Sequence, residues 1–138
     1  MEIEAGLCID LGTIALSEKE IIEFAKAYDP LDFHVDKIAA VDSIFGGLVA
    51  SGPHLFHFFY KQRWLPAMKD SILAGLEINR WKLERAVYPK HKYSGEARII
   101  FIKANKKKKH QVATWKFEFR DSKRNVVQSL EMTILHRL

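Results

Sequence analysis

The feature that most constrains this sequence is an aromatic-rich stretch from Pro53 to Leu65 that carries the signals of a buried helix. Ser51 or Gly52 can cap its start, and Pro53 suits the first helical turn, where its missing N–H is not needed. The apolar side chains of the stretch point around most of a helix circumference: Leu55, Phe56, Phe58, Phe59, Tyr60, Trp64 and Leu65. A helix that is apolar nearly all round must be buried nearly all round, so another part of the chain or a partner copy has to cover it.

The length and composition of the chain are those of one soluble domain. Its 138 residues can bury a core without cross-links, and 48% hydrophobic with 28% charged residues is an ordinary balance. The apolar stretch at 53–65 is too short, and too often interrupted by polar side chains, to cross a membrane. Cys8 is the one cysteine, which excludes an intramolecular disulfide, and no signal-peptide pattern is evident. We therefore expect one cytoplasmic domain over residues 1–138, with no membrane partner.

The positive charge of the chain favours anionic partners in general. The formal net charge of +5 is compatible with nucleic acid, a membrane surface or a phosphate-bearing small molecule. The densest run of lysines, 106–109, falls in a predicted hairpin turn and has no interleaved aromatic side chains that could stack on bases. We therefore expect no nucleic-acid partner, while contact between these lysines and a cofactor phosphate stays open.

The first half of the chain predicts one strand followed by helices. In order, we expect a strand at 7–14, a helix at 18–28, a loop at 29–36 and a short helix at 37–42. Ser17 and Glu20 form a capping-box pattern, which predicts where the first helix begins, and Pro30 helps to end it. Asp36 is suited to cap the short helix.

From residue 76 onward the hydrophobic period is that of strands. Alternation is cleanest at 111–120, where one side of the strand carries Ala113, Trp115, Phe117 and Phe119. A sheet with one buried face and one solvent-exposed face is typical of antiparallel strands. The expected strands are 76–83, 92–102, 111–120 and 126–138, with hairpin turns at 104–109 and 121–125. The assembled prediction is a single α+β domain in which a curved antiparallel sheet wraps around the hydrophobic helix, which is the hot-dog fold.

Asp29, His34 and Gly52 are the residues most suited to chemistry. The spacing of Asp29 and His34 excludes a shared helix face, but in a curled loop both side chains could reach one water and act as a general acid–base pair. Alternatively, Asp29 serves a turn and His34 is a surface or helix-entry residue. Gly52 stands where the buried helix begins, so its N–H could bind a carbonyl oxygen that gains negative charge. Alternatively, this glycine only permits close packing.

His54, His57 and Cys8 are weaker candidates for a functional role. His54 and His57 lie at i and i+3 on the buried helix, but no third ligand has a usable spacing. We therefore expect hydrogen-bonded interior histidines and no metal site. Cys8 lies in a strand-like run without a base-like partner, so we expect no nucleophilic role for it.

Two blocks of the sequence resemble the MaoC-like dehydratases, close relatives of the (R)-specific enoyl-CoA hydratases. In the first, 24–36, Asp29 and His34 fall on the two catalytic positions of the family's hydratase motif. The second, 45–54, is similar to the segment that leads into the family's central helix. There Gly52 matches the glycine whose backbone N–H holds the thioester carbonyl. The similarity extends over essentially the whole chain.

The resemblance implies a hot-dog domain that forms a homodimer or higher homo-oligomer, with the substrate's pantetheine arm between protomers. The implied reaction is the reversible hydration of a trans-2-enoyl-CoA or acyl-carrier thioester to the (R)-3-hydroxyacyl thioester, a step of fatty acid metabolism. In this interpretation Asp29 activates water as the base, His34 shares that water, and Gly52 stabilises the enolate oxygen. No metal or redox cofactor is implied, because coenzyme A or the carrier arm arrives as part of the substrate.

Two residues depart from the family's motif. Leu31 stands where the family has Asn or Gln, and Asp32 stands where it has Pro. An aliphatic side chain at 31 would loosen or reshape the catalytic loop, and Asp32 adds a negative charge near Asp29. These departures keep two alternatives open. One is a non-catalytic acyl-thioester-binding or structural hot-dog subunit, and the other is a hot-dog thioesterase.

Overall fold

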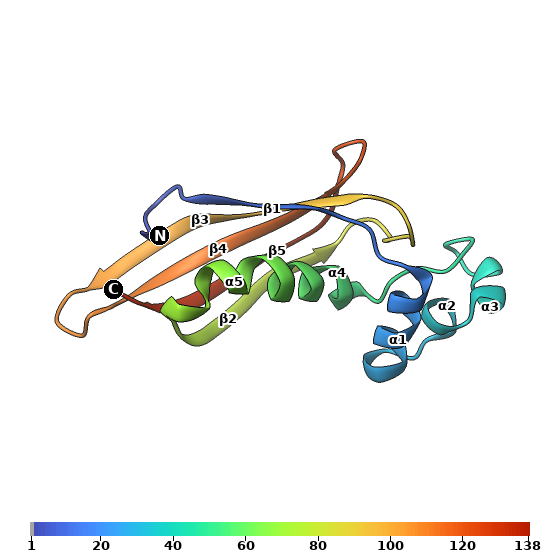
Figure 1. Cartoon of the computed structure of the whole chain (residues 1–138), viewed down its shortest axis with the longest axis horizontal. Coiled ribbons are helices and arrows are strands. Elements are labelled where there is room, and N and C mark those ends of the chain that lie inside the picture. The colour runs from blue at the N-terminus through green and yellow to red at the C-terminus, as the bar shows by residue number, and fades with distance from the viewer. Residues whose placement is uncertain (1) are drawn as a thin grey trace.

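A five-stranded antiparallel sheet runs along one side of the central helix in the computed structural model, which describes residues 2–138 (Figure 1). Its strands are β1 Cys8–Ile14, β2 Ile72–Leu83, β3 Tyr93–Asn105, β4 His110–Asp121 and β5 Val126–Arg137. They are arranged in the order β1-β3-β4-β5-β2, and every neighbouring pair is antiparallel. The predicted α+β class and wrapped-helix architecture are confirmed. The main boundary differences are that β2 begins at Ile72 and β3 continues to Asn105.

The helical segments all lie between β1 and β2. They are α1 Glu18–Tyr28, α2 Asp32–Val35, α3 Lys37–Val41, α4 Gly52–Phe59, the π-helical turn η1 Tyr60–Trp64, α5 Leu65–Met68 and the 3-10 turn η2 Lys69–Ser71. Within residues 2–138, none of them has the length and hydropathy that a bilayer crossing requires.

Local signals fix where α1 and α3 begin. The Ser17 hydroxyl accepts the Glu20 N–H and the Glu20 carboxylate accepts the Ser17 N–H, both over 3.0 Å, so the predicted capping box is confirmed. The Asp36 carboxylate accepts two N–H groups of the first turn of α3, also as predicted. The expected loop at 29–36 is wrong in part, because α2 forms inside it. There the extended Leu31 backbone accepts the N–H groups of His34 and Val35.

The core lies between the sheet and the central helix, which comprises α4, η1 and α5 (Figure 1). Phe59 of α4 stacks on Phe119 of β4, with ring centroids 5.0 Å apart. Trp64 meets Trp115 edge-on at 5.5 Å, and all four of these rings are fully buried. The expectation that this helix is buried nearly all round is wrong in part, because His57 and residues 61–63 are exposed. One face of the most apolar helix therefore stays open to solvent.

Gly95 of β3 leaves the space in which Phe59 and Phe119 stack. A Cβ built on Gly95 would lie 2.9 Å from Phe119 Cδ1 and 3.3 Å from Phe59 Cδ1. Both rings are fully buried, so neither can swing aside. We expect Gly95→Ala to lower the free energy of unfolding by about 1–3 kcal/mol, measured by urea denaturation. The matched control is Gly47→Ala, whose Cβ would meet nothing within 4 Å; an equal loss in both variants would contradict this explanation.

His136, near the end of β5, joins β4 and η2 through a chain of hydrogen bonds. The Trp115 indole N–H can only donate, and it donates to His136 Nε2 over 2.9 Å. The ring hydrogen therefore sits on Nδ1, which donates to the Ser71 hydroxyl over 2.8 Å, and that hydroxyl donates to the Met68 carbonyl. The ring is 0% exposed and its polar atoms are satisfied only in the neutral form. Burial accordingly lowers the pKa of His136 to about 4.

Candidate active site

Asp29 and His34 approach each other beside the start of α4. Asp29 is the C-cap residue of α1, where its N–H donates to the Ala25 carbonyl over 2.7 Å. His34 lies on α2, the short helix that follows. His34 Nε2 is 3.4 Å from Asp29 Oδ2. The structure thus brings this carboxylate and this imidazole together, as an acid–base pair requires.

The Val49 carbonyl fixes the tautomer of His34. His34 Nδ1 lies 2.7 Å from the Val49 carbonyl oxygen, which can only accept, so Nδ1 carries a hydrogen. In the neutral ring, Nε2 then presents its lone pair toward Asp29. An ionised carboxylate also only accepts, so a water or a proton is needed to link the two groups. His34 is 6% exposed and the Asp29 side chain is 33% exposed, so access to the pair is from the side of the carboxylate.

Ser51 holds the Asp29 carboxylate in place. The Ser51 hydroxyl donates to Asp29 Oδ2 over 2.7 Å, and the residue is 2% exposed. Ser51 is the N-cap residue of α4, but its side chain makes no capping hydrogen bond, because the hydroxyl is used on Asp29. Sequence reasoning missed this role. Nothing local indicated that residues so far apart in the chain would meet.

Gly52 begins α4, where backbone N–H groups have no partner within the helix. It lines a cavity of about 330 Å³ together with Asp29 and His34. A Cβ at this position would lie 2.5 Å from Leu83 Cδ1, a side-chain atom of β2. The close packing of Leu83 explains why this position needs a glycine, and the binding of a carbonyl oxygen by its N–H stays a prediction.

Gln128 of β5 ties the sheet to the start of α4. Its side-chain N–H donates to the Gly52 carbonyl over 2.8 Å, and its side-chain oxygen accepts the Trp81 indole N–H over 3.3 Å. Gln128 is 2% exposed and lines the same cavity as Gly52. This contact holds the backbone of Gly52 in place. In the sequence, the role of Gln128 was indicated only by its being a polar residue next to the alternating apolar residues of a predicted strand.

The two departures from the MaoC-like motif lie outside this cavity. The Leu31 side chain is 49% exposed, and Asp32 is exposed at the first position of α2. Leu31 shapes the turn through its backbone, since its N–H donates to the Asp29 carbonyl over 2.8 Å. Neither residue lines the cavity that holds Asp29 and His34. The chain therefore closes this turn without an amide side chain at position 31.

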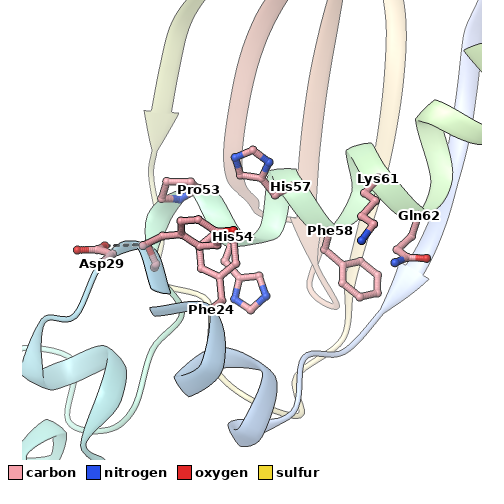
Figure 2. Close-up of a pocket in the computed structure, with 10 residues that line it drawn as sticks. Phe24, Asp29, Pro53, His54, His57, Phe58, Lys61 and Gln62 are labelled. Carbon is pink, nitrogen blue, oxygen red and sulfur yellow. Dashed lines mark hydrogen bonds between the residues drawn. The ribbon is translucent and has the colours of Figure 1, made fainter. Parts of the chain in front are cut away.

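A second and larger cavity, of about 600 Å³, follows the open side of the central helix (Figure 2). It shares Asp29, Ser51 and Pro53 with the first cavity. The rest of its wall consists of Phe24, Tyr28, His54, His57, Phe58, Lys61 and Gln62. The Asp29 carboxylate therefore borders both cavities.

The expectation of hydrogen-bonded interior histidines is wrong in part. His57 is exposed. His54 is 6% exposed and stacks flat on Phe24, with ring centroids 4.2 Å apart, but its Nδ1 is buried without a hydrogen-bond partner. The Phe24 side chain of α1 covers a flat face of the ring, so this interior histidine is placed by an aromatic contact. Burial lowers the pKa of His54 to about 4.

The remaining candidate groups lie apart from both cavities. Cys8 is exposed on β1, and burial together with the Glu96 carboxylate raises the pKa of its thiol. Lysines 106–109 form the turn between β3 and β4, at the end of the sheet away from α1 and α2 (Figure 1). Across residues 2–138, no three His, Cys, Asp or Glu side chains gather where they could hold a metal ion.

Comparison with known proteins first gives a partial sequence match. No protein-family model matches the chain. An uncharacterized protein of Bacillus subtilis, YdeM, is 31% identical over 90 residues. The match covers 64% of this chain and 63% of that protein, so the aligned part spans less than two thirds of the relative's length.

Solved structures match over nearly the whole chain. A MaoC-like dehydratase from Rhodospirillum rubrum has a TM-score of 0.84 and 24% identity over 98% of this chain and 93% of its own. A monoamine oxidase regulatory protein from Archaeoglobus has a TM-score of 0.86 and 22% identity, over 98% and 91%. An (R)-hydratase from A. caviae has a TM-score of 0.77 and 17% identity, over 97% of both chains. The expected resemblance to MaoC-like dehydratases is thus confirmed for the fold.

Proposed function

We propose that this chain, which has the hot-dog fold of the MaoC-like dehydratases, catalyses the reversible hydration of a trans-2-enoyl thioester to the (R)-3-hydroxyacyl thioester. The observation that carries the proposal is that Asp29, His34 and Gly52 line one cavity, with His34 Nε2 3.4 Å from Asp29 Oδ2. Coenzyme A or an acyl-carrier arm enters as part of the substrate. The proposed reaction uses no metal or redox cofactor.

In the proposed mechanism the thioester carbonyl accepts the Gly52 N–H. The start of α4 carries the positive end of the helix dipole, which favours the negative charge that the carbonyl oxygen gains as the enolate forms. One donor of this kind contributes about 3–4 kcal/mol in known oxyanion holes. Gln128 supports this position by holding the Gly52 carbonyl, which belongs to the next peptide group along the chain.

Asp29 and His34 then act on the attacking water. The Asp29 carboxylate takes a proton from the water as its oxygen bonds to C3, and the electrons of the C2–C3 double bond pass to the carbonyl oxygen. His34 accepts a hydrogen bond from the same water through Nε2, since the Val49 carbonyl keeps the ring hydrogen on Nδ1. The proton then returns to C2, which restores the thioester. Ser51 keeps the carboxylate directed at the reacting atoms.

The test is an assay of the purified chain with crotonyl-CoA, read by two signals. Hydration lowers the absorbance of the enoyl thioester without releasing thiol. A hot-dog thioesterase would instead release thiol, and a non-catalytic binder would gain thermal stability from the ligand without consuming it. Either of these two results would overturn the proposal.

We propose further that the chain acts as a homodimer joined through β2. This strand is an edge of the sheet, and its outer side has no partner strand among residues 2–138. It exposes Leu76 at 53%, Ile78 at 51% and Leu83 at 59%. Exposed edge strands with large apolar side chains are templates for pairing with another chain. Leu83 also lines the cavity at Gly52, so a partner on this edge would border the site.

Ile78→Lys is expected to convert the dimer to a monomer, because a desolvated lysine on the paired edge opposes association. Light scattering should give twice the 16.0 kDa chain mass for the wild type and the single mass for the variant. Ile38→Lys is the matched control, since Ile38 is 83% exposed on α3 and lies away from β2. A monomeric wild type, or dimers in both variants, would contradict this interface.

A further inference from the structure

The Asp29 carboxylate stands at the junction of two cavities. His34 and Gly52 line the smaller one, which would hold the thioester carbonyl and the reacting carbons. The larger one begins at Asp29 and Ser51 and follows the central helix to Lys61 and Gln62 (Figure 2). A substrate whose C3 lies beside Asp29 has its remaining acyl carbons directed away from the thioester. The larger cavity is a space of about 600 Å³ for those carbons.

The residues that line the larger cavity are aromatic at one end and include polar and charged side chains at the other. Near Asp29 the wall is aromatic, with Phe24 and Tyr28, whereas the Phe58 ring lies beside Lys61 and Gln62 (Figure 2). At the far end it carries the Lys61 ammonium and the Gln62 amide. Lys61 makes no salt bridge within residues 2–138, and Asp29, at the opposite end, is the one carboxylate that lines the cavity. The far end is therefore suited to an anionic group, whereas the near end is suited to a hydrocarbon chain.

His54 adds a donor partway along this cavity. The residue is 6% exposed, and its Nδ1 is buried with no partner. A hydrogen on Nδ1 would lack an acceptor, so the ring hydrogen belongs on Nε2. Stacking on Phe24 fixes the plane of this ring. With its hydrogen on Nε2, a histidine that lines a cavity can donate a hydrogen bond to a ligand there.

We propose that the preferred substrate carries a carboxylate at the far end of a medium-length acyl chain, and that this carboxylate pairs with Lys61. The inference rests on the proposed hydration at Asp29 and His34. A helix rises about 1.5 Å per residue, so Lys61 lies on the order of 13 Å along the axis from Gly52. The flexible stem of the lysine shortens the span that the acyl chain must cover.

The test compares two thioesters that differ only at the chain end. One is the N-acetylcysteamine thioester of trans-2-octenoic acid, and the other is its counterpart with a terminal carboxylate in place of the methyl group. We expect kcat/KM for the carboxylate form to exceed that for the methyl form by about tenfold or more, as for a charge-assisted pair worth about 1.4 kcal/mol. Lys61→Met should bring this ratio close to one. Lys69→Met, at an exposed lysine outside the cavity, should leave the ratio unchanged.

The choice of thioester removes a competing explanation. N-acetylcysteamine lacks the phosphates of coenzyme A, so a preference seen with it cannot come from contact between Lys61 and a cofactor phosphate. A wild-type ratio near one, or a ratio that survives in Lys61→Met, would overturn the inference. If the wild type hydrates the methyl form without preferring the carboxylate form, the inference fails and the proposed hydratase function stands.

A binding measurement keeps the inference testable even if neither thioester is hydrated. The corresponding saturated thioesters are then compared by their effect on the melting temperature of the protein. The carboxylate form should raise the melting temperature more than the methyl form, and Lys61→Met should remove this difference. Equal shifts with both ligands would overturn the inference on the acyl group, whereas the absence of hydration would overturn the proposed reaction.

Discussion

Asp29→Asn is expected to lower kcat/KM for enoyl-thioester hydration by about 10²–10⁴-fold, the usual effect of losing a general base. The asparagine amide keeps the size of the side chain, and its oxygen can still accept the Ser51 hydroxyl, so the local structure should persist. What is lost is the ability to take a proton from water. The measurement is the initial rate of crotonyl-CoA hydration, with circular dichroism to confirm that the variant is folded.

Asp32→Asn is the matched control for this experiment. It makes the same chemical change three residues further along, at an exposed position that does not line the cavity. We expect its kcat/KM to stay within about twofold of the wild type, because surface substitutions away from special features have small effects. Unchanged turnover in Asp29→Asn would remove the carboxylate from the mechanism. Equal losses in both variants would show that charge in this segment, rather than the base, is what matters.

Lowering the pH from 7 to 4 is expected to remove several kcal/mol from the free energy of unfolding. His54 and His136 are buried, and burial lowers the pKa of each to about 4 in the folded chain, against 6.5 when exposed. Between pH 6.5 and 4 the unfolded chain therefore binds more protons than the folded chain, so stability falls as the pH falls through this window. Each ring contributes up to about 3 kcal/mol, and their sum is comparable with a typical total stability.

His136→Gln separates this effect from general acid unfolding. A glutamine oxygen can accept the Trp115 N–H and its amide can donate to Ser71, but the side chain does not titrate. We expect about half of the pH dependence between 6.5 and 4 to disappear, measured as urea unfolding free energies across the window. His91→Gln, at an exposed histidine, should leave the dependence unchanged. A flat profile in the wild type, or the full dependence in His136→Gln, would contradict the assignment.

Much of the fold could be predicted because its signals are local. The alternation in β4 places Trp115, Phe117 and Phe119 on the buried face, and the structure has all three at 0% exposure. The capping box at Ser17 needed only neighbouring residues to be recognised. β2 was predicted less well at its start, because its ladder with β5 has three register shifts and the strand lies at an edge. Such register shifts interrupt the alternation of apolar and polar residues on which the strand prediction relied.

The candidate site could be predicted only in part, because local signals identify its residues but not the contacts between residues far apart in the chain. Asp29, His34 and Gly52 were identified from their own chemistry and from the MaoC-like motif. The groups that hold them were not, because each acts across the fold: Ser51 on Asp29, the Val49 carbonyl on His34, and Gln128 on Gly52. Sequence spacing carries no information about these contacts. The exposure of His57 was also missed, since periodicity alone does not show which side of an apolar helix the sheet covers.

The central claim is that Asp29 and His34 act as one unit on one water beside the Gly52 amide. The measurement that tests it most directly is a double-mutant comparison of kcat/KM for crotonyl-CoA hydration in wild type, Asp29→Asn, His34→Ala and the double variant. If the two residues act together, the double variant should lose about as much activity as the worse single variant. Losses that multiply, so that the double variant falls by the product of the two single effects, would contradict the claim.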